Sequence, residues 1–233
     1  NMMSQPATYF SNEFYTYLNK ENPRYKGFPK EEDFDKADYE LAYKKYKERF
    51  ANAADFEFFF VGNVDDKTIE AFASKYLASL PTTATKEKTV DLGYRMLKGD
   101  LKKVVNKGTD PKSNVTIMFY GEAKYSPKEA LAMEALGEVL TIKLVEQLRE
   151  SESGVYGVSA RGTMNKVPYG IYNFNIGFPC GPENAEKLTA SALNELQKII
   201  TNGPDEKDVA KYKEGELADY RKDSKENRFW LAN

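Results

Sequence analysis

Between Ser126 and Phe178 the spacing of apolar residues changes from that of a helix to that of a strand, and this change constrains the fold most. Ser126 to Glu129 (SPKE) combines a capping serine, a proline at the first helical position and a glutamate three residues after the cap. Helical spacing then continues to Arg149. From Tyr172 to Phe178, aromatic and aliphatic residues alternate with asparagine and glycine, which is typical of a half-buried strand.

Other strand patterns occur without a helix between them. We expect strands at Val155 to Arg161, at Val115 to Tyr120 and at Leu101 to Asn106. The short aromatic run Phe56 to Val61 (FEFFFV) predicts a buried strand. Because consecutive strands lack an intervening helix, the sequence favours an α+β fold, with a mostly antiparallel mixed sheet covered on one face by helices, over a parallel doubly wound sheet.

Helical spacing sets the expected domain organisation. Besides the helix after Ser126, apolar residues at helical spacing predict helices around 69–77, 188–200 and 209–220. The first part of the chain predicts two further helices, which a turn-rich connector joins. We therefore expect residues 1–54 to be a helical lead-in or linker from upstream sequence, and residues 55–233 to be one domain that is incomplete at its end.

The chain contains no histidine, which excludes several catalytic mechanisms. Histidine is the usual general base near neutral pH and the commonest metal ligand. Without it the chain cannot form a Ser-His-Asp triad, a Cys-His pair or an HExxH or HxxEH zinc helix. No GxxxxGK[ST] or GxGxxG phosphate-binding loop occurs either. The sequence therefore predicts that the chain does not carry out bond chemistry alone.

Composition narrows the possible partners. The net charge of −2 over 233 residues argues against binding to nucleic acid or to an anionic membrane surface. No apolar run is long enough for a membrane span. The single cysteine leaves the compartment open: the cytoplasm or, if an upstream signal was removed, the periplasm. Because Asn1 is not an initiator residue, we expect sequence upstream of it.

Three stretches of the chain, in this order, are similar to one known family. They are residues 49–64 (RFANAADFEFFFVGNV) with the helix that ends in KYLASLP, residues 148–158 (LRESESGVYGV), and residues 172–182 (YNFNIGFPCGP). Together they resemble the insulinase (pitrilysin) family of zinc peptidases, and specifically a domain from the non-catalytic C-terminal half. The resemblance covers about residues 31–225.

The resemblance implies a two-layer fold like that of mitochondrial processing peptidases, and two related halves that close around a peptide. In this family the zinc site, an HxxEH helix plus a distal glutamate, belongs to the N-terminal half. The resemblance therefore implies that zinc is bound by that half or by a partner subunit, and that this chain has no metal ligand or catalytic residue. It also implies that Arg149 and Tyr156, seven residues apart, reach the peptide substrate.

The residue types of this pair fit the implied role. A guanidinium offers only hydrogen-bond donors, and a phenol can offer one more. Two donors directed at a peptide carbonyl could orient the substrate and stabilise the oxyanion that develops when water attacks. The alternative is structural: Arg149 could pair with a nearby glutamate while Tyr156 packs in the core.

Three other residues are weaker functional candidates. Cys180 has no histidine to activate it, so a buried structural thiol fits better than a nucleophile. Glu150 and Glu152 flank Arg149, but solvated carboxylates are a better interpretation than zinc ligands, because zinc favours imidazole and thiolate.

Three functional hypotheses remain from the sequence. The first is the non-zinc half of a metalloendopeptidase, which forms part of the chamber wall and supplies substrate-binding donors. The second is a catalytically inactive paralogue that acts as a structural or partner subunit. The third is an unrelated hydrolase that uses two carboxylates, for which no pair stands out among the acidic residues. An intact or eroded HxxEH motif in upstream sequence would separate the first from the second.

Overall fold

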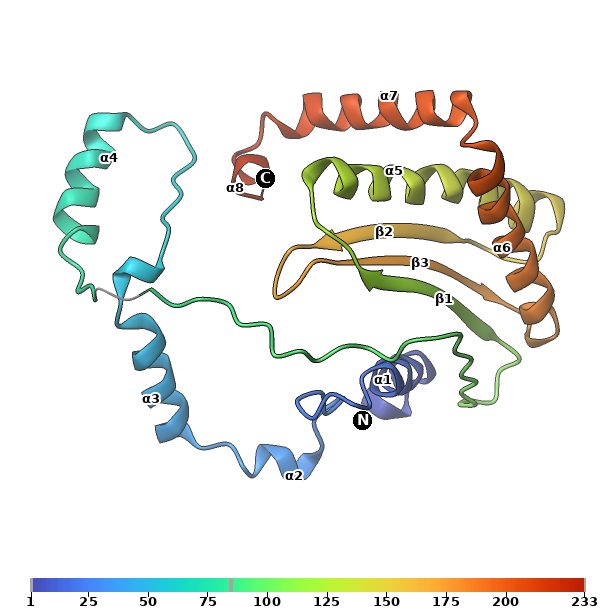
Figure 1. Cartoon of the computed structure of the whole chain (residues 1–233), viewed down its shortest axis with the longest axis horizontal. Helices are drawn as coiled ribbons and strands as arrows, with labels where there is room; N and C mark the ends of the chain where they lie inside the picture. Colours follow the sequence, from blue (N-terminus) through green and yellow to red (C-terminus); the bar gives the residue numbers. More distant parts are fainter. Residues whose placement is uncertain (1, 84–85, 233) are drawn as a thin grey trace. The chain divides into compact units, whose positions relative to one another are not determined.

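The computed structural model describes residues 2–83 and 86–232, and the chain divides into two compact units (Figure 1). Unit 1 contains residues 1–27 and 90–216, and unit 2 contains residues 28–89 and 217–233. None of the helices in the described residues is both long and apolar enough to cross a membrane.

Unit 1 is built on a three-stranded antiparallel sheet. Its strands are β1 (Ser113–Glu122), β2 (Ser159–Asn165) and β3 (Ile171–Cys180), in the order β1-β3-β2. The register places Phe119 opposite Phe174 and Ala160 opposite Ile176. The even-numbered residues of β3 therefore share one face with their partners on both neighbours. This sheet, together with the helices that cover it, confirms the expected α+β class.

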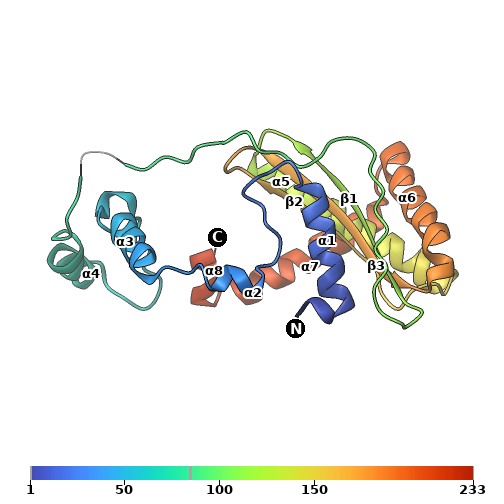
Figure 2. The same ribbon diagram turned by 90° about the horizontal axis from the view of Figure 1, so that it is seen from below.

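The helices of unit 1 form where the sequence predicts them. They are α1 (Pro6–Leu18), α5 (Pro127–Leu144), α6 (Ala185–Asn202) and most of α7 (Glu206–Asp223), with short 3-10 turns at Met2–Ser4 and Pro182–Asn184. The amide of Glu129 donates to the Ser126 hydroxyl at 3.1 Å, so the predicted cap starts α5. Figure 1 and Figure 2 show α5 on one side of the sheet and α1 on the other.

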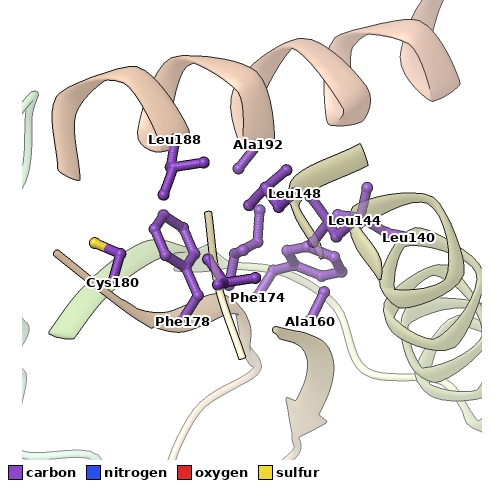
Figure 3. Close-up of a cluster of buried hydrophobic side chains, with 11 residues drawn as sticks. Leu140, Leu144, Leu148, Ala160, Phe174, Phe178, Cys180, Leu188 and Ala192 are labelled. Carbon is purple, nitrogen blue, oxygen red and sulfur yellow. The ribbon is translucent and has the colours of Figure 1, made fainter. Parts of the chain in front are cut away.

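The core of unit 1 lies between the sheet and helices α5 and α6. Most of its side chains come from one face of β3 and from the helix surfaces that cover it (Figure 3), and Ala160 of β2 and Val155 complete it. The buried members are Leu140, Leu144, Leu148, Val155, Ala160, Phe174, Ile176, Phe178, Cys180, Leu188 and Ala192. Burial of one large aliphatic or aromatic side chain contributes about 1.5–3 kcal/mol. This cluster is therefore the main source of stability in unit 1.

Two glycines let α5 approach β2 closely. A Cβ atom on Gly162 would lie 2.2 Å from the Met133 carbonyl oxygen, and one on Gly137 would lie 3.0 Å from the Arg161 Cα. At the same place the Thr141 hydroxyl accepts a hydrogen bond from the Ala160 amide at 2.8 Å. Helix α5 thus satisfies part of the free edge of β2, an edge that would otherwise be open to pairing with another strand.

Unit 2 consists of short helices joined by extended chain. Its helices are α2 (Glu31–Phe34), α3 (Tyr39–Phe50), α4 (Asp66–Phe72) and α8 (Asn227–Ala232), together with the 3-10 turn Ala53–Asp55, a π-helix at Ala73–Leu77 and the end of α7. Among the described residues of this unit only Asn52 is buried. Its side-chain oxygen accepts from the Thr83 amide at 2.8 Å, and its amide group donates to Asp55 at 2.8 Å.

Three strand predictions need correction. Phe56 to Val61 and Leu101 to Asn106 have no strand assignment, and the strand expected from Val155 begins at Ser159 instead. Val155 makes only an isolated bridge with Cys180. A strand exists only where a neighbour supplies a hydrogen-bonded ladder, and within the described residues neither of the first two segments has one.

Candidate substrate-binding site

Arg149 lies on an exposed turn at the end of the α5 helix. Residues Val145–Ser151 continue α5 as a π-helix, a local widening that is frequent at functional sites. Leu148 is fully buried and anchors this turn in the core, whereas the next residue, Arg149, is exposed. The π-helix therefore presents the guanidinium to solvent beside a fixed backbone.

The carboxylates near Arg149 do not neutralise it. Glu152 accepts a hydrogen bond from Gln147 at 3.1 Å and pairs with Lys187 at 3.0 Å. The hydrogen bond from Gln147 is the largest cause of the lowered pKa of the Glu152 carboxyl, and contacts with Ser191 and Lys187 add to it. Arg149 makes no hydrogen bond or ion pair with any residue that the structure describes. Its donors are thus available for a ligand.

Tyr156 is exposed to almost its full extent. Its side chain is 96% exposed, while the preceding Val155 is buried. The chain enters this position through a tight turn in which Ser153 has a φ of 50° and the Gly154 amide donates to the Leu148 carbonyl at 2.9 Å. The alternative that Tyr156 packs in the core is therefore wrong.

The two residues belong to the same connection, between the end of α5 at Leu144 and the start of β2 at Ser159. Both are solvent-exposed donors, and the buried side chains of Leu148 and Val155 fix the backbone beside them. Such an arrangement can donate hydrogen bonds to a carbonyl oxygen. That the pair contacts a peptide stays a prediction.

The described residues offer no zinc site. No group of three or more Asp, Glu or Cys side chains is placed to hold a metal ion in residues 2–83 and 86–232. The single thiol, Cys180, is buried in the core, and this burial raises its pKa. Zinc is bound by imidazole, thiolate and carboxylate in close tetrahedral groups. The residues present therefore do not fit the metal, and the chain's own chemistry has to be considered without it.

A second polar feature, which sequence reasoning missed, lies around Arg95. Its guanidinium binds Asp91 at 2.7 Å and Glu122 at 2.9 Å, and it stacks 3.6 Å above the Tyr169 ring. The hydrogen bond from Arg95 is the largest cause of the lowered pKa of Asp91, about 2. Arg95, Glu122 and Tyr169 help to line a cavity of about 360 Å³ beside β1. In the sequence, only the four-residue spacing of Asp91 and Arg95 could have indicated this cluster. The contact of Arg95 with Tyr169 depends on the fold.

Because the Arg95 guanidinium donates to carboxylates of unit 1, this cluster acts as a structural clamp, a set of contacts that joins segments distant in sequence. It ties the extended segment before β1 to the end of β1 and to the turn before β3. The Tyr120 hydroxyl, which donates to the Leu97 carbonyl, holds the same segment. We assign the Arg95 cluster a structural role.

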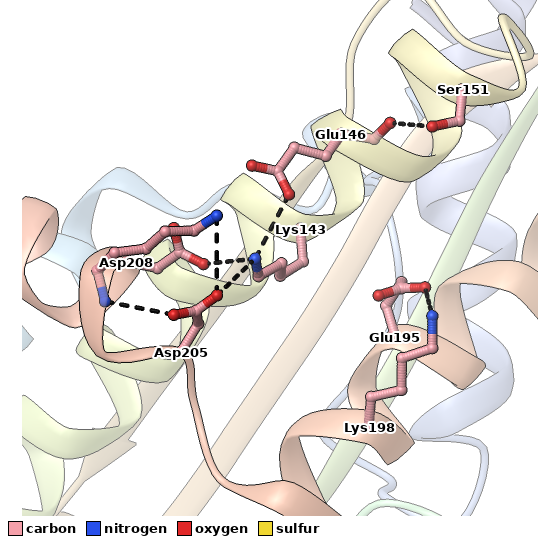
Figure 4. A network of polar contacts seen from close by, with 8 residues as sticks. Lys143, Glu146, Ser151, Glu195, Lys198, Asp205 and Asp208 are labelled. Carbon is pink, nitrogen blue, oxygen red and sulfur yellow. Dashed lines mark hydrogen bonds and ion pairs between the residues drawn. The ribbon is translucent and has the colours of Figure 1, made fainter.

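Lys143 makes a comparable clamp between helices α5 and α7 (Figure 4). Its ammonium lies 2.7 Å from Asp208, 3.4 Å from Glu146 and 3.5 Å from Asp205. The hydrogen bond with Asp208, which is buried, is the largest cause of the raised pKa of Lys143. The network fastens the first turn of α7 to α5 and does not include Arg149.

Comparison with known proteins identifies the class. The family model of the peptidase M16 inactive domain matches residues 41–216, so the chain belongs to this family. This confirms the resemblance to the C-terminal half of insulinase-type peptidases. Two curated relatives are both named "Probable zinc protease PqqL". The one from Haemophilus influenzae is 27% identical over 74% of this chain, and the one from Escherichia coli is 24% identical over 72%.

Solved structures show the same fold. The periplasmic protease PqqL from Escherichia coli aligns with a TM-score of 0.77 at 20% identity, over 97% of this chain and 25% of that one. The ferredoxin protease FusC, solved as a mutant in complex with Arabidopsis ferredoxin, aligns with a TM-score of 0.72 at 15% identity, over 95% of this chain and 24% of that one. The chain spans 18% of the length of each curated relative, so it corresponds to one part of those proteins.

Proposed function

We propose that this chain is a C-terminal-half domain of a zinc metalloendopeptidase. It forms part of the wall of a peptide-enclosing chamber and supplies substrate-binding donors, while zinc is held by an N-terminal half or a partner subunit. Membership in the M16 inactive-domain family supports the non-catalytic role. The observation that carries the proposal is the exposed Arg149, without a partner among the described residues, in the same connection as the fully exposed Tyr156.

The two donors would act on the peptide rather than on the metal. The guanidinium has a planar fork of N–H groups and the phenol has one O–H. Bonds from both to a carbonyl oxygen near the scissile bond would fix the peptide in one orientation. If the bonds shorten as that oxygen becomes negative, they stabilise the transition state more than the bound substrate.

Substitutions in the full-length gene product test this role. We expect Arg149→Ala to lower kcat/KM by roughly 10- to 100-fold, because a hydrogen bond to a charged group contributes about 1.5–3 kcal/mol. Tyr156→Phe should lower it by less. Arg149→Lys should recover only part of the loss, because a point charge does not reproduce the planar fork. A fall in kcat would indicate a bond made in the transition state, and a rise in KM one made to the bound substrate.

Arg161→Ala is the matched control, since Arg161 is also exposed and has no partner among the described residues but lies on β2. Its kcat/KM should stay close to that of the wild type. Unchanged turnover in Arg149→Ala and Tyr156→Phe, together with lower melting temperatures, would make the pair structural.

An inactive paralogue that serves as a structural or partner subunit is the second candidate. The absence of histidine from this chain fits an inactive paralogue equally well, because a subunit without peptidase activity needs no metal ligand. The sequence of the rest of the gene product separates the two candidates. An HxxEH motif favours the peptidase, and an eroded motif favours the paralogue.

A further inference from the structure

The directions of the Arg149 and Tyr156 side chains depend on the turn formed by residues 149–156, most of which is irregular. The π-helix ends at Ser151 and β2 begins at Ser159, so neither a helix nor a strand holds the residues between them. Neither Arg149 nor Tyr156 makes a hydrogen bond with any described residue. Because a displacement of about 1 Å can cost roughly 100-fold in rate, other contacts of the turn must fix the two donors.

The carboxylate of Glu152 connects this turn with two helices. Its Oε1 accepts a hydrogen bond from the Gln147 side chain on the π-helix at 3.1 Å, and its Oε2 lies 3.0 Å from the Lys187 ammonium on α6. The Gln147 hydrogen bond is the largest cause of the lowered pKa of this carboxyl, and Ser191, one turn further along α6, is the next. Only 11% of the Glu152 side chain is exposed. The sequence-based interpretation of Glu152 as a solvated carboxylate is therefore wrong.

The partners of Glu152 belong to elements that the core of unit 1 holds in place. Removal of a charge from water is unfavourable unless fixed partners replace the water. Leu148 anchors the π-helix in the core, and Leu188 anchors α6 there. A Cβ atom on Gly154 would lie 2.7 Å from a side-chain carbon of Leu188, so α6 also packs against the turn two residues after Glu152. These contacts restrict the turn to a backbone arrangement in which the carboxylate reaches both helices.

The backbone of the turn has an unfavourable conformation beside Glu152. The Glu152 amide donates to the Gln147 carbonyl at 3.0 Å, and the Gly154 amide donates to the Leu148 carbonyl at 2.9 Å. Between them Ser153 has a φ of 50°, in the left-handed region that residues other than glycine seldom adopt. Such a conformation persists only where the surrounding structure imposes it, and it is frequent at functional sites.

We propose that Glu152 is a positioning residue: by tying the turn to α6, it sets the directions in which Arg149 and Tyr156 present their donors. It does not contact the substrate itself, because its carboxylate is largely buried against Gln147 and Lys187. The fixing of the turn follows from these contacts alone. Its effect on catalysis rests on the proposed function of the two donors, so the two effects need separate measurements.

Hydrogen exchange followed by NMR tests the fixing of the turn in the 233-residue chain. Glu152→Ala should speed exchange of the amides of residues 152 and 154 by about 10-fold or more, because hydrogen bonds to a charged group no longer hold the turn closed. Glu150→Ala is the matched control, since Glu150 lies on the same π-helix, is exposed and has no partner among the described residues. Unchanged exchange in Glu152→Ala, or an equal increase in the control, would overturn the proposal.

Kinetics of the full-length gene product test the link to the donors. Glu152→Ala should lower kcat/KM by roughly 10- to 100-fold. The loss should fall on the same parameter, kcat or KM, as in Arg149→Ala, because Glu152 acts through that residue. Glu152→Gln, which keeps the side-chain length and an acceptor oxygen, should recover most of the activity. Added to Arg149→Ala with Tyr156→Phe, Glu152→Ala should cost little more, and a full further loss would overturn the proposal.

The two measurements separate this inference from the proposed function. Faster exchange in Glu152→Ala, with normal turnover in Arg149→Ala and Tyr156→Phe, would overturn the proposed function and support the fixed turn. Unchanged exchange and turnover in Glu152→Ala, with impaired Arg149→Ala, would overturn this inference alone. If Glu152→Ala does not fold, Gln147→Leu removes a donor to the carboxylate instead. It should speed exchange of the same two amides, and unchanged exchange would count against the assignment.

Discussion

Unit 1 and unit 2 both contain many large apolar side chains, but unit 1 buries them and unit 2 leaves them exposed. In unit 1 the leucines of α5 and the phenylalanines of β3 meet across one interface and are buried. In unit 2 the ring of Phe56 lies 5.4 Å from that of Phe50 on α3, but the phenylalanines of the segment 56–61 remain 36–74% exposed. Hydrophobic patterns therefore have different outcomes in the two units, and the deciding factor is whether the unit itself supplies a layer that faces them.

The largest expected effect lies in the core of unit 1. Leu144→Ala removes a fully buried side chain and should lower the free energy of unfolding by about 2–5 kcal/mol. The matched control is Leu131→Ala on the same helix, 56% exposed, which should change it by less than about 0.5 kcal/mol. Urea unfolding followed by circular dichroism measures both. Similar costs for the two variants would show that unit 1 does not provide the stability.

An intermediate effect is expected at the Lys143 clamp. Lys143→Met leaves Asp208 buried without its partner and should cost about 2–4 kcal/mol, somewhat below a fully buried pair because the lysine is partly exposed. Lys112→Met, which breaks a fully solvated pair with Asp110, is the control and should cost less than about 1 kcal/mol. A loss no larger than that of the control would show that the clamp does not hold α7 to α5.

The same clamp predicts a pH dependence. The pKa of Lys143 is raised in the folded chain, so its contribution is complete below the ordinary lysine pKa of about 10.4 and is lost as the pH rises through the raised value. The wild type should therefore lose stability relative to Lys143→Met on alkaline titration above that point. Parallel curves for the two would contradict the assigned pKa direction.

The smallest effect is expected in unit 2. In the 233-residue chain, Phe59→Ala should change the free energy of unfolding by less than about 0.5 kcal/mol, because an exposed ring gives up little burial. In the full-length gene product the same change should cost several times more if another part of that protein covers the ring. Equal small costs in both proteins would remove the contrast between free and covered states.

The difference between unit 1, which buries its own apolar residues, and unit 2, which does not, also explains what could be predicted from the sequence. The Ser126 cap and the alternation in β3 depend on contacts close in sequence or on a face buried within the unit, and both were predicted. Phe56 to Val61 was wrong as a strand, because a ladder requires a partner that the sequence of the segment does not specify.

The candidate site was partly predictable. The family resemblance singles out Arg149 and Tyr156, but the exposure of Tyr156 follows from the turn at Ser153 and the anchoring of Val155, which depend on the fold. The stacking of Arg95 on Tyr169 joins residues far apart in sequence, and only the folded chain brings them together.

Our central proposal is that this chain is part of a metallopeptidase whose metal chemistry lies outside it. The most direct test is a zinc titration of the purified 233-residue chain, with metal content and peptide hydrolysis measured on the same sample. Because its side chains offer no zinc site in the described residues, we expect no stoichiometric zinc and no hydrolysis. One tightly bound equivalent of zinc, with hydrolysis that a chelator abolishes, would contradict the account.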